Sequence, residues 1–471
     1  MFWANFLHIY QPPIQKPYWV NRVAKESYYK IFRLLTENPS AKITMNINSG
    51  LLEMLEKCGH TDIIEMIEKL IFRGQLELTG SAKYHPLLPF LPVQEIIRQV
   101  KLNEKTLAHY FGSKKKLNLK GFFPPEMAFS PQLAKIIADL GYKWIIVDEL
   151  SFPREGPRQK YDRIYQMPGF KDFSIFFRER QMSWVILSGQ TGTGRLLIQS
   201  LGERLKKQEY LLTAMDGETF GHHRPGLEML LFEIYKSNLL KTVKISELFD
   251  LFPKRESIKP ISSTWALMEK DLEKKKPFAR WDDKDNSIHQ AQWELTKLAI
   301  KAVTGAPKKA QGYNKARQIL DRALHSDQYW WASAKPWWSI EMIERGAKEL
   351  YGAVIFSPGI NKKIKNKAKE LYYKIIFTAF DWQRSGIVDE FSRKEDEEIR
   401  QRTDTSLPKL PRQEIEKMIK QLEKEMELVA SHREYERAAQ IRDRIKELER
   451  YVSDQDFSTS AEGDREFKLS K

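Results

Sequence analysis

The first half of the chain alternates short β-rich runs with longer segments whose apolar residues recur every three or four positions. Strand, helix, strand at this spacing predicts a parallel sheet with right-handed crossovers. Seven or eight strands favour closure into a barrel, and an open doubly wound sheet is the alternative. The runs are FWANFLHIY (2–10), KITMNI (42–47), QLELTG (75–80), LKGFF (119–123), KWIIVDE (143–149), DFSIFF (172–177), SWVILS (183–188) and EYLLTAM (209–215).

The residue pattern changes in the second half. We expect residues 1–285 to form the α/β domain and the aromatic, helix-patterned residues 286–391 to form a helical domain packed on it. Residues 392–413 are polar and contain two prolines near their end, which predicts a linker. Residues 414–451 carry two apolar stripes with a short break between them, which predicts two antiparallel helices. The polar tail, 452–471, is expected to be disordered.

Composition narrows the class of protein. With 471 residues, 41% of them hydrophobic, the chain can bury a large core. Cys58 is the single cysteine, so no disulfide forms within the chain, which fits a reducing compartment. No apolar run reaches the ~18–20 residues of a membrane span. The first residues lack a basic region before their apolar part, so we interpret them as a strand rather than a signal peptide and predict a cytoplasmic protein.

The formal net charge of +15 raises the question of a polyanionic partner. The basic residues are interspersed with 63 acidic ones in local runs, as on solvated faces and linkers. No basic segment has the period of a nucleic-acid recognition helix. We therefore expect no nucleic-acid partner.

Polar side chains follow the strands where each one ends. In parallel α/β folds the loops at the C-terminal ends of the strands converge on one face, so these side chains are expected to surround one cleft. They are His8, Gln11, Glu77, His85, Glu126, Asp148, Glu149 and Asp216.

Glu126 and Asp216 are the two carboxylates on which the functional interpretation depends. Pro124 and Pro125 restrict the backbone before Glu126, and we expect them to present it from a stiff, extended support. Two carboxylates at separate strand ends suit glycoside hydrolysis, in which one attacks the anomeric carbon and the other protonates the leaving oxygen. A retaining enzyme needs them ~5–5.5 Å apart.

A metal site is the rival interpretation, because His222 and His223 lie close to Asp216 in sequence and His8 ends another strand. Adjacent histidines on a strand or helix point apart, however, and no HxxxH or HxH spacing is present. The chain also lacks a GxSxG nucleophile motif and a phosphate-binding GxxxxGK[ST] loop. The spacing therefore favours acid–base chemistry with no metal and no cofactor.

Five segments in order resemble the motifs of glycoside hydrolase family 57, a set of retaining α-glucan-active enzymes. The resemblance spans roughly residues 1–380. The segments are HIYQPP (8–13), GQLELTGSAKYHPLLP (74–89), GFFPPEMAFSP (121–131), MDGETFG (215–221) and SDQYWWAS (326–333).

The resemblance implies a distorted seven-stranded β/α barrel, followed by a helical domain that closes over the cleft, and no metal. It makes Glu126 the nucleophile and Asp216 the acid/base. It places the sugar against His8, Gln11, Glu77, His85, Asp327 and Trp330, with Trp330 stacking on a glucose ring. Tyr10 stands where the family usually has a second histidine. A tyrosine still donates a hydrogen bond to a sugar hydroxyl, but it never becomes cationic. We therefore expect this difference to affect the sugar subsites and specificity more than catalysis.

The segment LEKEMELVASHREYERAAQIRDRIKEL, within 414–451, resembles the UVR motif, a helical hairpin named for bacterial excision-repair proteins. In other proteins that motif mediates protein contacts. Its presence here predicts docking to a protein partner or self-association.

The leading hypothesis is a retaining glycoside hydrolase or transglycosylase that acts on α-1,4-linked glucans or maltooligosaccharides. Two alternatives stay open: a catalytically silent carbohydrate-binding or scaffold protein that acts through its hairpin, and a metal-dependent polysaccharide deacetylase.

Overall fold

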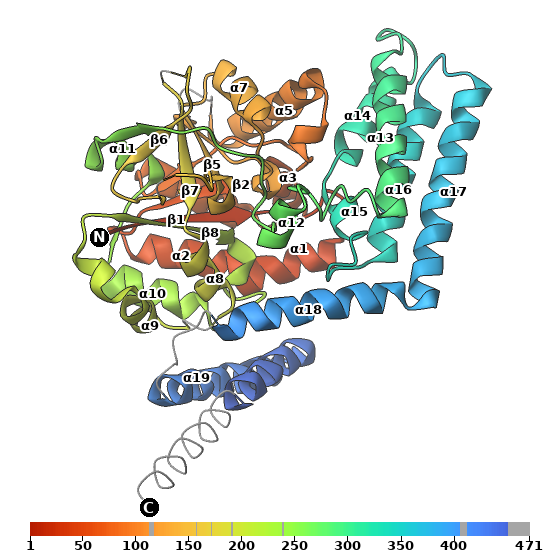
Figure 1. Ribbon diagram of the computed structural model, residues 1–471. Coiled ribbons are helices and arrows are strands. Elements are labelled where there is room, and N and C mark those ends of the chain that lie inside the picture. Colours follow the sequence, from red (N-terminus) through yellow and green to blue (C-terminus); the bar gives the residue numbers. More distant parts are fainter. Residues whose placement is uncertain are drawn as a thin grey trace, which may run out of the picture.

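The computed structural model describes residues 1–112, 117–156, 158–170, 172–189, 192–237, 240–405 and 412–450. Figure 1 shows a region of strands wrapped in helices, a group of long helices beside it, and the C-terminal helices beneath it. Among the residues described, no helix is both long enough and apolar enough to cross a bilayer.

The first sheet has five parallel strands, and its register sets up the functional residues. Its order is β3-β2-β1-β8, and β9 pairs with the start of β1. His8 pairs with Asn46 of β2 and with Asp216 of β8, so His8 and Asp216 end neighbouring strands. The strands are β1 (Phe2–Ile9), β2 (Ile43–Ile47), β3 (Leu76–Leu78), β8 (Tyr210–Asp216) and β9 (Lys241–Thr242).

The second sheet has the order β10-β6-β7-β5-β4. The pair β6 and β7 is antiparallel, and the other pairs are parallel. The strands are β4 (Gly121–Phe122), β5 (Trp144–Asp148), β6 (Ile164–Gln166), β7 (Ser174–Arg178) and β10 (Arg255–Ser257).

The α/β class is confirmed, but a single closed barrel is not, because the hydrogen bonds define two sheets. On one side a parallel bridge joins Gly80 to Phe122. On the other side the amide of Glu179 donates to the carbonyl of Leu212 (2.6 Å). Two aromatic rings crowd the first link: a Cβ at Gly80 or Gly121 would lie 2.1 Å from the ring side chain of Tyr142 or Trp144 respectively.

Alternate strand residues enter two apolar clusters, as the two-residue period of a strand requires. On β1, Ala4 and Phe6 join a buried cluster with Trp144, Phe176 and Tyr210. Trp3, Leu7 and Ile9 join the larger cluster, which the surrounding helices complete. These helices include α1 (Pro17–Val23), the π-helix η1 (Ala24–Tyr28), α2 (Tyr29–Glu37), α3 (Ser49–Lys57), α4 (Thr61–Phe72), α5 (Val93–Phe111), α7 (Pro131–Asp139), α9 (Gly194–Leu201) and α10 (Glu228–Ser237).

One predicted strand is wrong. The run SWVILS lies in the helix α8 (Arg180–Leu187). Glu179 caps this helix by accepting a hydrogen bond from the amide of Met182. Met182, Val185 and Ile186 are buried at a spacing of three and four, so the run has one buried helical face.

The region 286–391 is built of long helices that pack on one another, as Figure 1 shows. Arg317 of α14 makes two hydrogen bonds to the carboxylate of Glu95 on α5 (2.9 and 2.7 Å), which fastens this region to the strand-bearing part. The helices are α13 (Ser287–Thr304), α14 (Tyr313–Ala323), the short α15 (Asp327–Trp330), α16 (Ile340–Phe356) and α17 (Lys362–Ser385).

The structure differs from the polar linker predicted for 392–413 in that residues 392–405 are helical and belong to α18 (Ile387–Thr405). Glu395 explains the difference: it is buried and accepts hydrogen bonds from Arg280 and from Lys270 (3.3 Å for the latter). A polar sequence can thus be an ordered helix when its acids pair with bases of another segment. Residues 406–411 lie outside the described residues.

The C-terminal hairpin consists of α19 (Arg412–Ser431) and a second helical stretch, 435–450. Arg433 has a left-handed backbone (φ 61°) at the turn between them. The helices pack together through Ile415, Leu422, Ile441, Ile445 and Leu448, and this cluster includes Leu196 of α9. The tail, 452–471, lies outside the described residues.

Replacing Gly121 by alanine should destabilise the junction of the sheets, because the new Cβ would lie 2.1 Å from the Trp144 ring. Overpacking of this kind costs ~1–3 kcal/mol. The control is Gly352→Ala on α16, where the nearest atom is 3.9 Å from the new Cβ and alanine is the better helix former. Thermal unfolding should show a lower midpoint for Gly121→Ala and an unchanged or higher one for Gly352→Ala; equal midpoints would contradict the packing described.

Candidate active site

His8 and His85 lie at the centre of the group of predicted site residues. His8 Nδ1 is hydrogen-bonded to Asn46 Oδ1 (2.9 Å), and the Nε2 atoms of the two imidazoles are 3.0 Å apart. Nδ1 of His85 is 3.0 Å from Ser326 Oγ. Burial lowers the pKa of His85 to about 4, and burial followed by the charge of His85 lowers that of His8. At neutral pH the two rings therefore form an uncharged hydrogen-bonded chain.

Glu126 is held by donors from distant parts of the chain. The indole N–H of Trp265 donates to its Oε2 (2.9 Å) and the hydroxyl of Ser326 to its Oε1 (3.3 Å). His85 Nδ1 lies 3.7 Å from the same Oε1. The side chain keeps 16% of its surface exposed, so it remains reachable for a ligand.

The backbone at Glu126 differs from the predicted extended support. Extended geometry ends at Pro124, and Glu126 lies in the turn η3 (Pro125–Met127) with φ 61°. Met127 is also left-handed, with φ 45°. Non-glycine residues in this region cost of order 1–3 kcal/mol, and such strain clusters at functional sites. The two prolines still restrict the approach to the turn.

Asp216 forms a pair with Glu218, two residues further on. Burial raises the pKa of Asp216 to about 6, and the Arg178 guanidinium acts in the opposite direction. Burial, and then the charge of Asp216, raises the pKa of Glu218 to about 8. Glu218 accepts hydrogen bonds from the Tyr10 amide (3.1 Å) and the Tyr28 hydroxyl. At neutral pH the pair is therefore not fully ionised, because burial and the repulsion between the two carboxylates oppose the second charge.

Asp327 completes a carboxyl cluster, which we define as Glu126, Asp216, Glu218 and Asp327. Its Oδ2 accepts hydrogen bonds from the Tyr10 hydroxyl (2.6 Å) and from His325 Nδ1 (3.0 Å). The Tyr10 ring stacks on His85 with centroids 4.0 Å apart. Burial opposes ionisation of Asp327, but His325, His85 and Tyr10 together lower its pKa.

Glu126 is a member of this cluster whose pKa is raised by the charges of other members. Burial is the largest cause that raises the pKa of Glu126 to about 8, and the charges of Asp327 and Asp216 add to it. The Trp265 and Ser326 hydrogen bonds act in the opposite direction. Carboxylates that repel one another in a buried site cannot all ionise, so the cluster holds protons at neutral pH.

Three predicted residues lie outside the centre of the group. Gln11 donates to the Tyr28 hydroxyl (3.4 Å), and Tyr28 in turn donates to Glu218 of the carboxyl cluster. Glu77 accepts hydrogen bonds from Thr44 (3.0 Å) and from the Ser246 amide (3.1 Å), and it stays a prediction as a sugar contact. Trp330 packs on Trp281 with ring centroids 5.1 Å apart, in an apolar cluster of Leu87, Ala128, Trp293 and Tyr329.

The sequence did not indicate Trp265, Ser326 or His325. His325 and Ser326 directly precede Asp327, which lies in a predicted motif. Their position next to a predicted site residue is the sequence signal that could have identified them. Trp265 comes from a region with few strand signals and reaches Glu126 across 139 residues. His222 contacts Glu26 rather than the carboxyl cluster. Within the described part of the chain, no group of three His, Cys, Asp or Glu side chains is placed to hold a metal ion.

Comparison with known proteins gives two family matches. The model of glycosyl hydrolase family 57 matches residues 6–260, and the UvrB/uvrC motif matches residues 416–451. An alpha-amylase of Pyrococcus horikoshii is 25% identical over 234 residues, 49% of this chain and 36% of its own length. A 4-alpha-glucanotransferase of Thermococcus litoralis is 25% identical over 182 residues, 38% of this chain and 27% of its own length. The chain thus spans about a third of these relatives or less.

Solved structures share the fold. A branching enzyme of Pyrococcus horikoshii gives a TM-score of 0.58 at 16% identity, covering 80% of this chain and 96% of its own. The 4-alpha-glucanotransferase of Thermococcus litoralis gives 0.57 at 17% identity, covering 75% of this chain and 57% of its own.

Asp327→Asn should lower the thermal stability at pH 7, because the ionised carboxylate accepts two hydrogen bonds in a largely buried site. The expected loss is about 2–4 kcal/mol. The control is Asp381→Asn, a surface acid paired with Arg384 and 58% exposed, which should change little.

The pH dependence follows from the lowered pKa of Asp327. Ionised Asp327 stabilises the folded chain above its unfolded pKa of ~3.9, and this contribution is lost as pH falls through the lower folded value. The gap between the melting temperatures of Asp327→Asn and wild type should therefore be widest at neutral pH and close in acid. A gap that is independent of pH would contradict this assignment.

Proposed function

The chain belongs to glycosyl hydrolase family 57, and from this membership and the carboxyl cluster we propose that it is a retaining α-glucan-active hydrolase or transglycosylase. The proposed substrates are α-1,4-linked glucans and maltooligosaccharides, in keeping with the relatives named alpha-amylase and 4-alpha-glucanotransferase. The observation that carries the proposal is that Glu126 and Asp216 lie on either side of the hydrogen-bonded His8–His85 pair: His85 Nδ1 is 3.7 Å from Glu126, and His8 pairs in register with Asp216.

In the proposed first step, a carboxylate oxygen of Glu126 bonds to the anomeric carbon while the bond from that carbon to the leaving oxygen breaks. Asp216 gives its proton to the leaving oxygen. In the second step, water or a sugar hydroxyl attacks the same carbon and the ester to Glu126 breaks. Asp216 takes the proton of the attacking group and is thereby restored.

The pKa values define which form reacts. Glu126, raised to about 8, must be ionised, and Asp216, raised to about 6, must be protonated. Because the group that must be ionised has the higher pKa, the reactive form is a minority at every pH. Its population, and with it the rate, is expected to be greatest midway between the two pKa values and to fall on either side. The Trp265 and Ser326 hydrogen bonds support the proposal because they favour the ionised form of Glu126.

The surrounding residues suit recognition of a neutral, hydroxyl-rich ligand. We propose that His8 and His85 contact the sugar as neutral imidazoles, and that Tyr10, Gln11 and Asp327 hold its hydroxyls. Trp330 would stack on a ring further along the glucan. The hydrogen bond from Tyr10 to Asp327 (2.6 Å) supports a role for this tyrosine in fixing a carboxylate that the sugar would meet.

We further propose that the two sheets act together as an incompletely closed seven-stranded barrel. In this arrangement region 286–391 completes the site, since Ser326 and Asp327 come from it. The proposed domains keep their boundaries at 1–285 and 286–391, and region 414–451 is a helical hairpin with a role in protein contacts.

Incubation with maltoheptaose tests the proposed activity. Shorter products alone would indicate hydrolysis, and a ladder of shorter and longer products would indicate transfer. Asp216→Asn should lower the rate ~10²–10⁴-fold, because it removes the proton donor. Glu126→Gln should abolish turnover, because it removes the nucleophile.

Glu247→Gln is the matched control, because Glu247 pairs with Lys42 beside the start of β2, at the other end of the strands. It should leave turnover near the wild-type level. An inactive wild type that still binds maltoheptaose would favour the silent scaffold. Acetate release that a chelator stops would favour the deacetylase.

A further inference from the structure

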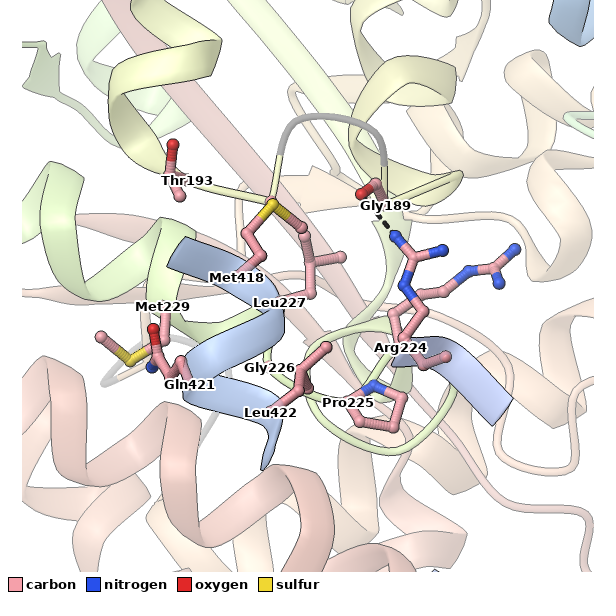
Figure 2. A pocket seen from close by; sticks show the side chains of 12 residues that line it. Gly189, Thr193, Arg224, Pro225, Gly226, Leu227, Met229, Met418, Gln421 and Leu422 are labelled. Atoms are coloured by element: carbon pink, nitrogen blue, oxygen red, sulfur yellow. Dashed lines mark hydrogen bonds between the residues drawn. The ribbon is translucent and has the colours of Figure 1, made fainter. Parts of the chain in front are cut away.

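The C-terminal hairpin packs on the strand-bearing part of the chain. A Cβ at Gly192 would lie 2.1 Å from Met418, and one at Gly226 would lie 3.0 Å from Leu422, so small residues accept the α19 side chains. Figure 2 shows Met418 and Leu422 beside Gly226 and Leu227. These contacts place the hairpin next to the loop that follows Asp216.

Arg437, on the second helix of the hairpin, is the side chain that enters this loop. It is 4% exposed, and its Nη2 donates to the carbonyl of Gly221 (2.6 Å). The guanidinium also lies 3.6 Å from Glu26 and 3.5 Å from Glu425. A buried arginine is stable here because two carboxylates balance its charge.

Glu26 contacts both Arg437 and the loop that follows Asp216. This residue of η1 is hydrogen-bonded to His222 and to Arg22 (2.9 Å for the latter). Burial opposes its ionisation, but His222, Arg437 and Arg22 together lower its pKa. The carboxylate is therefore an ionised anchor shared by the hairpin, η1 and the loop.

The loop itself has little freedom to move. Gly221 has φ 103°, and a Cβ there would lie 2.1 Å from the carbonyl oxygen of Glu26. The next two residues of η1 hold the loop as well: Ser27 donates to the Gly217 carbonyl (3.0 Å), and Tyr28 donates to Glu218. A displacement at Gly221 would therefore be transmitted to Gly217 and Glu218, which adjoin Asp216.

We propose that Arg437 is a positioning residue for Asp216, so that the hairpin forms part of the catalytic unit and fixes the loop that carries the acid/base. This inference rests on the proposed glucan-cleaving function. It acts through the Gly221 carbonyl and Glu26, not through contact with substrate.

The matched pair Arg437→Gln and Arg444→Gln tests the proposal in the full-length chain. Arg444 is also buried on the same helix, and its Nη2 donates to the carbonyl of Gly189 (2.8 Å) rather than to that of Gly221, although it lies beside Arg224 at the end of the loop. With maltoheptaose, Arg437→Gln should lower kcat about tenfold with KM within about twofold, because small misplacements of a catalytic group cost rate. The limb of the pH profile that reports Asp216 should shift. Arg437→Lys should recover part of kcat, and Arg444→Gln should keep both kcat and the profile.

Hydrogen exchange of residues 217–222, which excludes the Arg224 end of the loop beside Arg444, gives a readout that needs no turnover. Arg437→Gln should speed exchange there about tenfold, and Arg444→Gln should not, because a lost anchor opens the loop locally. Equal effects of the two variants on kcat and on exchange would overturn the proposal. If wild type does not act on any α-glucan, the proposed function fails, and exchange alone decides whether Arg437 holds the loop.

Discussion

Four carboxyl groups lie close together in a largely water-excluded site, and the cost of burying their charge governs what surrounds them. Asp327 stays ionised because Tyr10 and His325 donate to it. Glu126, Asp216 and Glu218 have raised pKa values because burial outweighs the donors to the two glutamates and the charge of Arg178 beside Asp216. A site that stores protons on carboxyls at neutral pH suits chemistry in which one acid gives a proton and another attacks.

The fold supplies the cluster from three sources. The register of β1 and β8 brings His8 beside Asp216. The strained turn after β4 presents Glu126, and Trp265 and Ser326 reach it from far along the chain. The short α15 begins at Asp327. No single element holds the cluster, so the packing of the helical region on the sheets, including the Arg317–Glu95 pair, is as necessary to the site as the strands are.

The sequence predicted the site best where an apolar strand pattern is followed directly by a polar residue. The strands that carry His8 and Asp216 near their ends, and the strand that precedes the turn of Glu126, follow from apolar runs that stop at polar residues. The run 183–188 misled because its apolar residues suit a strand and a helix alike, and only the cap at Glu179 decides between them. The short strands β9 and β10 and the contacts of Trp265 and Arg437 depend on partners more than 70 residues away in sequence, which a local pattern does not reveal.

Capture of the glycosyl-enzyme tests the central claim most directly. Asp216→Asn is mixed with an α-glucosyl fluoride, whose leaving group departs without a proton donor, and the protein is digested and weighed by mass spectrometry. Because deglycosylation is slow without the acid/base, we predict one added glycosyl unit on the peptide that contains Glu126. An adduct on another carboxylate, or fluoride release with no adduct at any time, would contradict the assignment of Glu126 as the nucleophile.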